Sequence, residues 1–186
     1  VVELIDYLGP ARPGAPVRAL PGEGTHVPVW MLGSSLYGAQ LAAHLGLPYA
    51  FASHFAPAQM MDAIRLYRDK FKPSEQLDKP HVMLGFNVIA ADSDGEAQRL
   101  ATSVQQAFVA LRSGAPGKLP PPVEGYAESL PPAAAAMLDQ LLSCSAIGSV
   151  ETVRRQMLDF VERTGADELI VVSQIHDHQA RRRSYE

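Results

Sequence analysis

The segment from Gly33 to Gly38, which also holds Ser34, Ser35 and Tyr37, is the part of this sequence best suited to bind an anion. It follows a short apolar run and precedes a stretch rich in alanine and leucine, an order typical of a buried strand that turns into a helix. Backbone N–H groups in the first turn of a helix are unpaired and attract anions such as phosphate. Glycine backbone and serine hydroxyls suit such a pocket. An ordinary serine N-cap is the alternative, and spacing alone favours the cap.

A second candidate lies at the end of the next apolar run, where Ser53 and His54 are adjacent. A histidine there can act as an acid or base or contact a ligand, and Ser53 can contact a bound cofactor. A histidine hydrogen-bonded in a loop is an equally weighted alternative. Asn87, inside a later apolar run, is better interpreted as a hydrogen-bonded core amide. Ser173 and Gln174 close the last run, where ordinary strand-end polarity explains them.

Metal and thiol chemistry have weaker support. His176 and His178 are separated by one residue, and a pair without a nearby third ligand is a poor metal signal. Cys144 is the single cysteine and is expected to be a small buried residue rather than a nucleophile. One cysteine excludes an intramolecular disulfide and fits a reducing compartment, so we expect a cytoplasmic protein.

The elements that must position these residues alternate along the chain. Apolar runs predict strands at residues 26–33, 47–55, 81–92 and 168–175. Apolar spacing and caps predict helices at residues 34–46, 57–71, 93–111, 133–143 and 149–164. Ser93 with Glu96 forms a capping box, and Ser149 is a good N-cap. Residues 1–26 are predicted to be a loop-like lead-in, and the proline-rich residues 113–132 a long loop.

Four apolar strands separated by helices predict a parallel sheet in an α/β protein. Two architectures fit: an open doubly wound sheet, or part of a (β/α)8 barrel, of which four βα units are half. Neither GxGxxG nor GxxxxGK[ST] occurs, so Rossmann and P-loop sites are not indicated.

Composition narrows the function classes. The chain has 186 residues, 47% apolar, with a formal net charge of -4, which suits a globular domain and not a disordered chain. No apolar run approaches the length of a membrane span, and no large basic block indicates a nucleic-acid partner. The chain begins with Val1 rather than methionine, so we expect it to be a piece of something longer.

Three stretches, in order, resemble the bacterial luciferase-like, flavin-dependent monooxygenase family (the LLM class of oxidoreductases). They are VPVWMLGSSLYGAQLAAHLGLPYAFASHFAP at residues 27–57, DSDGEAQRLA at 92–101 and GSVETVRRQMLDFVERTGADELIVVSQIHDH at 148–178. The individual motifs are loose, whereas their order and spacing over nearly the whole chain are specific.

The resemblance implies the C-terminal half of a (β/α)8 TIM barrel that binds FMN at the carboxyl ends of its strands. It assigns the FMN phosphate to Ser34, Ser35, Tyr37 and Gly38, with Gly33 shaping the turn, and so reverses the preference for a simple cap. The implied chemistry is oxidation of a small organic substrate with O2 by reduced FMN, which a flavin reductase would supply. A homodimer is implied as well, with neither a nucleic acid nor a membrane as partner.

The resemblance further implies a single domain over residues 1–186 with an insertion at 93–143, between the last two strands. That insertion could act as a lid over the flavin or be a plain surface excursion. Because the family draws important residues from the first barrel strands too, this chain alone is expected to be inactive. Alternatives are a non-catalytic flavin-binding barrel protein, an F420-dependent oxidoreductase of the same fold, and an open-sheet domain that binds a phosphorylated ligand.

Overall fold

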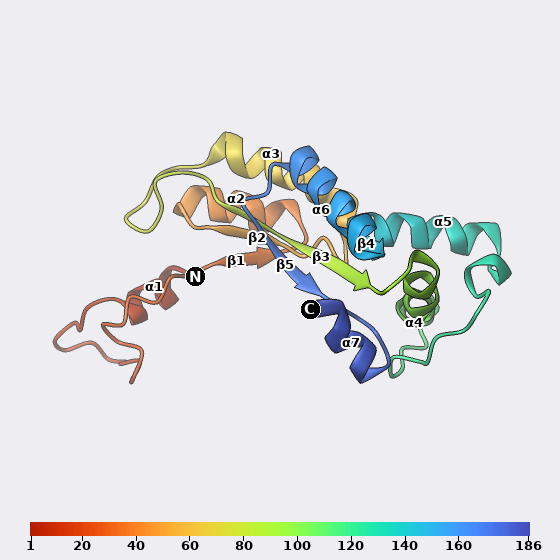
Figure 1. Ribbon diagram of the computed structural model, residues 1–186. Helices are drawn as coiled ribbons and strands as arrows, with labels where there is room; N and C mark the ends of the chain where they lie inside the picture. The colour runs from red at the N-terminus through yellow and green to blue at the C-terminus, as the bar shows by residue number, and fades with distance from the viewer.

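Five parallel strands frame the molecule, and the computed structural model describes all of residues 1–186 (Figure 1). The strands are β1 (Met31–Gly33), β2 (Tyr49–Phe51), β3 (Val82–Ala90), β4 (Ser145–Gly148) and β5 (Glu168–Val172). The longest strand, β3, pairs with three others: β2 and β5 flank its first half, and β4 pairs with its second half. The sheet is therefore the α/β arrangement that the alternating pattern predicts.

Helices connect the strands and cover mainly one face of the sheet. They are α1 (Val2–Leu8), α2 (Leu36–Leu45), α3 (Met60–Lys70), α4 (Asp94–Arg112), α5 (Pro132–Leu141), α6 (Val150–Thr164) and α7 (His178–Tyr185), with short 3-10 turns at Pro57–Gln59, Ala127–Ser129 and Leu142–Cys144. In Figure 1, α2, α3 and α6 lie together on one side of the strands. Their core includes the Phe86 and Phe160 rings, whose centroids are 4.5 Å apart.

The opposite face of the sheet is largely uncovered. Alternation along the strands directs Leu32, Ala50, Met83 and Ile170 to this side, which we call the open face. Leu32 is 69% exposed and Ile170 is 51% exposed, although both are apolar strand residues. Helices α4, α5 and α7 cover only the carboxyl end of this face: α4 and α5 contribute to a separate apolar cluster, against which Ala180 of α7 packs, and Ser184 of α7 accepts from the Ala90 N–H of β3. Such a sheet, covered on one side only, is what half of a barrel presents.

Two elements differ from the sequence prediction. The lead-in contains the seven-residue helix α1, which buries none of its residues and so shows no amphipathic pattern. Strand β4 was not predicted, because its four residues, Ser-Ala-Ile-Gly, are too few and too mixed to form an apolar run. The predicted insertion at 93–143 therefore lies between β3 and β4 and not between the last two strands, since β5 follows.

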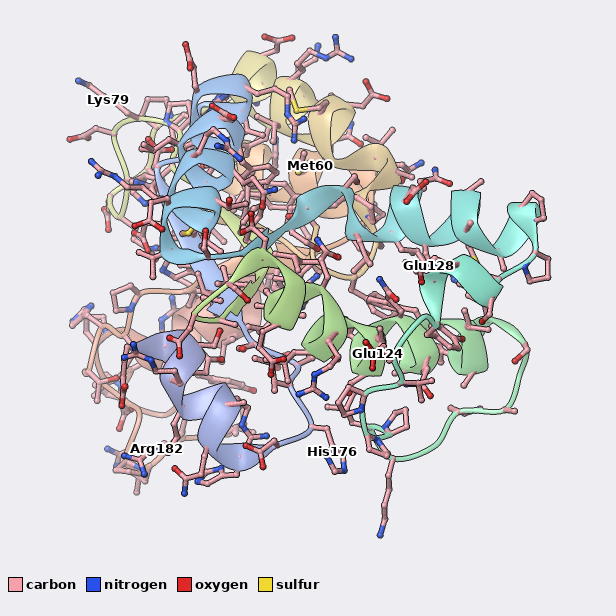
Figure 2. The ribbon with its side chains drawn as sticks, turned by 45° about the vertical axis from the view of Figure 1, so that its right-hand side comes forward. Met60, Lys79, Glu124, Glu128, His176 and Arg182 are labelled. Carbon is pink, nitrogen blue, oxygen red and sulfur yellow. The ribbon has the colours of Figure 1, made fainter.

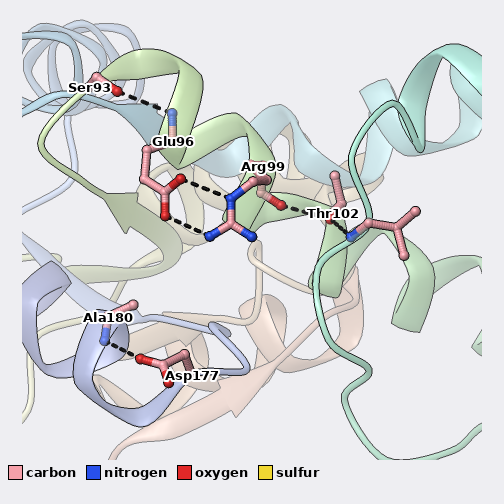
Figure 3. A network of polar contacts seen from close by, with 7 residues as sticks. Ser93, Glu96, Arg99, Thr102, Asp177 and Ala180 are labelled. Atoms are coloured by element: carbon pink, nitrogen blue, oxygen red, sulfur yellow. Dashed lines mark hydrogen bonds and ion pairs between the residues drawn. The ribbon is translucent and has the colours of Figure 1, made fainter.

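Half of the predicted capping box is present at the start of α4: Glu96 N–H donates to Ser93 Oγ at 3.2 Å, whereas the Glu96 carboxylate pairs with Arg99 and does not return to the Ser93 N–H (Figure 3). Further along α4, Thr102 Oγ1 accepts a hydrogen bond from the backbone N–H of Val123 at 2.8 Å. This contact ties residues 113–131, the excursion loop, to the helix. In Figure 2 the excursion loop, marked by Glu124, lies beside α4.

Candidate functional site

The glycine–serine turn, residues 33–38, joins the carboxyl end of β1 to the start of α2. Ser34 and Ser35 are both exposed. Ser35 occupies the N-cap position in an extended conformation, yet its side chain makes no capping hydrogen bond. The hydroxyl of the expected cap is therefore available to a ligand, and the N–H groups of the first turn of α2 remain open.

Two other helices, α4 and α7, have this end capped by the side chain of their N-cap residue, whereas the remaining helices, like α2, make no such hydrogen bond. Ser93 caps α4, and Asp177 caps α7 by accepting from Ala180 N–H at 2.8 Å (Figure 3). At α6, Asp94 of helix α4 places a carboxylate at the helix N-terminus, where its Oδ1 accepts from the N–H of the N-cap residue Ser149 at 2.6 Å. By contrast, α2 has no acidic residue in its first turn. An anion at the N-terminus of α2 would thus meet free backbone N–H groups and the positive end of the helix dipole, with no carboxylate of the first turn competing for them.

Tyr49 of β2 forms a hydrogen bond to the backbone of the glycine–serine turn. Its hydroxyl donates to the Ser35 carbonyl oxygen at 3.2 Å, and burial raises its pKa to about 12, so it remains a neutral donor. A Cβ built on Gly38 would lie 3.6 Å from the Tyr49 ring, and one on Gly33 would lie 3.8 Å from Gly38 Cα. A Cβ at either position would therefore make ordinary van der Waals contact and would take up space beside the turn that glycine leaves free. Tyr37 points outward and is 73% exposed.

His54 follows β2 and lies over the open face of β3. A Cβ built on Gly85 would be only 1.9 Å from His54 Nδ1, so the ring sits directly on the glycine backbone. Nδ1 is buried and has no hydrogen-bond partner. Burial also lowers the His54 pKa, which favours the neutral ring. The sequence analysis missed Gly85, although an isolated glycine inside an apolar strand signals a close approach.

Ser53 and Asn87 hold this arrangement in place. The fully buried Ser53 hydroxyl donates to the Gly85 carbonyl oxygen at 2.7 Å, so it faces the protein and not an open cleft. Asn87 Nδ2 donates to the His54 carbonyl oxygen at 3.0 Å and to Ser145 Oγ at 3.3 Å. Asn87 Oδ1, in contrast, is buried without a partner. Asn87 is thus a hydrogen-bonded core amide through its nitrogen, while its oxygen has no partner.

The structure brings the two candidate groups to one edge of the sheet. The backbone N–H of Ala52 donates to the Gly33 carbonyl oxygen at 2.9 Å, which joins the segment carrying His54 to the glycine–serine turn. The carboxyl ends of parallel strands meet at one edge, where α/β proteins bind ligands.

The remaining candidates lie elsewhere. Ser173 hydrogen-bonds to Ser184 Oγ at 3.1 Å, under helix α7. His176 extends into solvent (Figure 2), and no group of three or more metal-ligating side chains forms. Cys144 is buried 3.8 Å from the Met60 sulfur, and burial raises its pKa, so it is a poor nucleophile. Every helix falls short of the length and apolar character that spanning a bilayer requires.

Comparisons with known proteins agree on one family. The family model described as luciferase-like monooxygenase matches residues 3–168. A luciferase-like monooxygenase of Escherichia coli (strain K12) is 50% identical over the whole chain, which covers 56% of that protein. An uncharacterized protein of Bacillus subtilis (strain 168) is 48% identical over 91% of the chain and 51% of its own length. The chain thus spans about half the length of these relatives.

Solved structures share the fold. The crystal structure of apo-MsnO8 is 33% identical, with a TM-score of 0.72, over 92% of this chain and 52% of that one. The oxygenating constituent of 3,6-diketocamphane monooxygenase from Pseudomonas putida, solved in complex with FMN, is 19% identical with a TM-score of 0.57, over 89% of this chain and 46% of that one. Both match about half of a longer chain, as expected for a partial luciferase-like barrel.

Proposed function

The chain belongs to the luciferase-like monooxygenase family, and on that premise we propose that it forms the phosphate-binding part of an FMN-dependent oxidoreductase site. The observation that carries the proposal is the open N-terminus of α2, which lies between two glycines at the carboxyl end of β1. A helix N-terminus without a side-chain cap suits a phosphate.

The residues present fit the FMN phosphate. The Ser34 and Ser35 hydroxyls are exposed at the turn and can donate to phosphate oxygens, as can the N–H groups of Tyr37 and Gly38. Because Gly33 and Gly38 carry no side chains, an anion can approach the backbone of the turn closely. The FMN complex of the Pseudomonas putida relative supports this choice of cofactor.

Bound reduced FMN would supply the reaction with O2 that oxidises a small organic substrate. In this proposal the chain holds the phosphate at α2, while His54, neutral and joined to the turn through β2, faces the reacting region from the open face. Ser53 positions His54 by fixing the Gly85 backbone, rather than by contacting the cofactor. A reductase that delivers reduced FMN and a homodimeric whole protein belong to the same proposal.

Flavin titration tests the phosphate contact. FMN and riboflavin, which lacks the phosphate, are each titrated against the chain and the variant Ser34→Ala/Ser35→Ala by quenching of flavin fluorescence. We expect the double variant to bind FMN about tenfold more weakly, because two hydrogen bonds to a charged group are lost. Riboflavin binding should stay unchanged.

A matched control removes two exposed hydroxyls far from α2, in Ser129→Ala/Ser143→Ala, and should bind FMN like the original chain. If the Ser34/Ser35 variant keeps full FMN affinity, or loses riboflavin equally, the turn does not hold the phosphate. A parallel titration with coenzyme F420 decides between the two flavin classes, since tighter F420 binding would replace FMN in the proposal.

A further inference from the structure

A cleft of about 580 Å³, which we call the amino-edge cleft, lies near the amino ends of β1 and β2. Val29, two residues before β1, lines it together with Leu47, two residues before β2, and Leu45, the last residue of α2. The glycine–serine turn lies at the other end of both β1 and α2, and a helix of that length spans about 15 Å. The amino-edge cleft is therefore separate from the proposed flavin site.

Hydrogen bonds hold both walls of the amino-edge cleft. On one wall, Gln76 Oε1 accepts from Val29 N–H at 3.1 Å, and Gln76 Nε2 donates to the Val29 carbonyl oxygen at 3.0 Å. On the other wall, His26 N–H donates to the Leu8 carbonyl oxygen at 2.9 Å, which ties the lead-in to the end of α1. The cleft thus exists before a ligand binds, and its volume lies in the range of about 300–1,000 Å³ typical of small-molecule sites.

Apolar side chains from both walls and from the end of α2 line much of the amino-edge cleft. They are Ile5, Leu8, Val27, Val29, Leu45 and Leu47. Such a lining suits the apolar body of an organic molecule, which leaves water when it binds there.

Glu75 supplies the unpaired charge of the amino-edge cleft. The other lining carboxylate, Asp6, accepts from Arg12 Nη2 at 2.9 Å, so these two charges offset each other. The Glu75 side chain is exposed and forms neither an ion pair nor a hydrogen bond, and the His26 imidazole has no partner either. Two carboxylates against one guanidinium leave the lining with an excess of negative charge, which favours a cation over an anion.

We infer that the amino-edge cleft binds a small organic cation, with its ammonium group at Glu75 and its apolar body against Val29 and Leu45. A primary ammonium group donates to a carboxylate in a charge-assisted hydrogen bond. An organic anion would be repelled by Glu75 and would have to displace Asp6 from Arg12 to find a partner. An uncharged analogue would keep the apolar contacts alone.

Three phenyl-bearing probes of similar size test the inference: phenethylammonium, phenethyl alcohol and hydrocinnamate. Each is titrated into the chain at about pH 8, at which histidine side chains are ordinarily neutral. NMR follows the Gln76 side-chain amide and the Gly9 backbone amide, both of which line the cleft. We expect phenethylammonium to shift both signals and to bind about twofold to fivefold more tightly than the alcohol, the effect of a solvent-exposed ion pair, with hydrocinnamate weakest.

Glu75→Gln assigns the charge preference to this carboxylate. The variant should bind phenethylammonium only as tightly as phenethyl alcohol, and its affinity for the alcohol should stay unchanged. Asp78→Asn is the matched control, because it removes a carboxylate of the same loop that does not line the cleft. That control should bind all three probes like the original chain.

Ile5→Ala tests the apolar part of the cleft and should weaken all three probes about threefold, because apolar contact area is lost. Leu4→Ala, on the same helix but outside the cleft, is its control and should leave the three affinities unchanged. Helix α1 buries none of its residues, so neither change threatens the fold.

Equal or tighter binding of hydrocinnamate, full phenethylammonium affinity in Glu75→Gln, or unmoved Gln76 and Gly9 signals with every probe would each overturn the inference. The titrations contain no flavin, so their outcome is independent of the FMN experiment. A chain that binds FMN but not phenethylammonium contradicts the amino-edge cleft alone.

Discussion

Replacing Gly85 by alanine should displace the His54 ring and destabilise the protein. A Cβ at position 85 would lie 1.9 Å from His54 Nδ1, 2.8 Å from Cε1 and 3.0 Å from Cγ. Ordinary contact begins at 3.4 Å, so the nearest atom is 1.5 Å too close (3.4 minus 1.9). An overlap of this size requires the ring to leave its position, and Asn87, which bonds to the His54 carbonyl oxygen, keeps the backbone from moving with it.

The expected cost of Gly85→Ala is about 1–3 kcal/mol of unfolding free energy, the range for overpacking a well-packed site. Urea unfolding measures it as a lower midpoint with an unchanged m-value. Gly95→Ala is the matched control, since a Cβ there has nothing within 4 Å and Gly95 lies inside helix α4. That change should stabilise the protein by about 0.5–1 kcal/mol.

A double-mutant cycle with His54→Ala isolates the clash. His54→Ala removes the three atoms nearest to a Cβ at position 85, so Gly85→Ala should then cost much less than in the original chain. The coupling between the two changes should therefore account for most of the single-variant cost. An equal cost of Gly85→Ala in both backgrounds would refute the contact between ring and glycine.

Three further predictions concern titration and anchoring. The His54 pKa, measured by NMR at the ring C2–H, should lie below that of a histidine peptide, because burial lowers it. The neutral ring makes its full contribution to stability above about pH 6.5, the unfolded value, and that contribution is lost as the pH falls from there through the lower folded pKa. Asp94→Ala should lower the urea midpoint, because it removes the carboxylate that accepts from the Ser149 N–H at the N-terminus of α6. Since that hydrogen bond lowers the Asp94 pKa, the difference from the original chain should vanish as acid protonates the carboxylate. Thr102→Val should speed hydrogen exchange at Val123 in the excursion loop several-fold, because that N–H loses its acceptor.

Each of these three has an outcome that contradicts it. A His54 midpoint at or above the peptide value would mean that the ring is solvated. An Asp94→Ala difference that persists at low pH would show that packing of the Asp94 side chain, and not its charge, stabilises the contact between α4 and α6. Unchanged exchange at Val123 would mean that other contacts hold the excursion loop; Gln106 Nε2, which donates to the Pro121 carbonyl oxygen at 3.0 Å, is the first of these.

Local signals predicted the elements that depend on neighbouring residues alone. The cap at Ser93, the left-handed glycines Gly46 and Gly165 that end α2 and α6, and the apolar run of β3 all follow from short-range chemistry. They appear in the structure close to their predicted positions. The same kind of signal failed for β4, which exists because Ala146 and its neighbours pair with the second half of β3. Pairing over that separation leaves no trace in four mixed residues.

The sequence by itself therefore determined the order of strands and helices, the family, and the glycine–serine turn, because each is encoded in contiguous residues. Only the tertiary structure decided which polar groups are satisfied. Ser53, a predicted cofactor contact, donates to the Gly85 carbonyl oxygen of another strand, whereas Ser35, also a predicted cofactor contact, does not make the capping hydrogen bond that its spacing allows. The unpaired atoms of His54 and Asn87 likewise exist only where β2 and β3 meet. A hydrogen bond depends on distance and direction in space, and chain spacing does not specify either across separate strands.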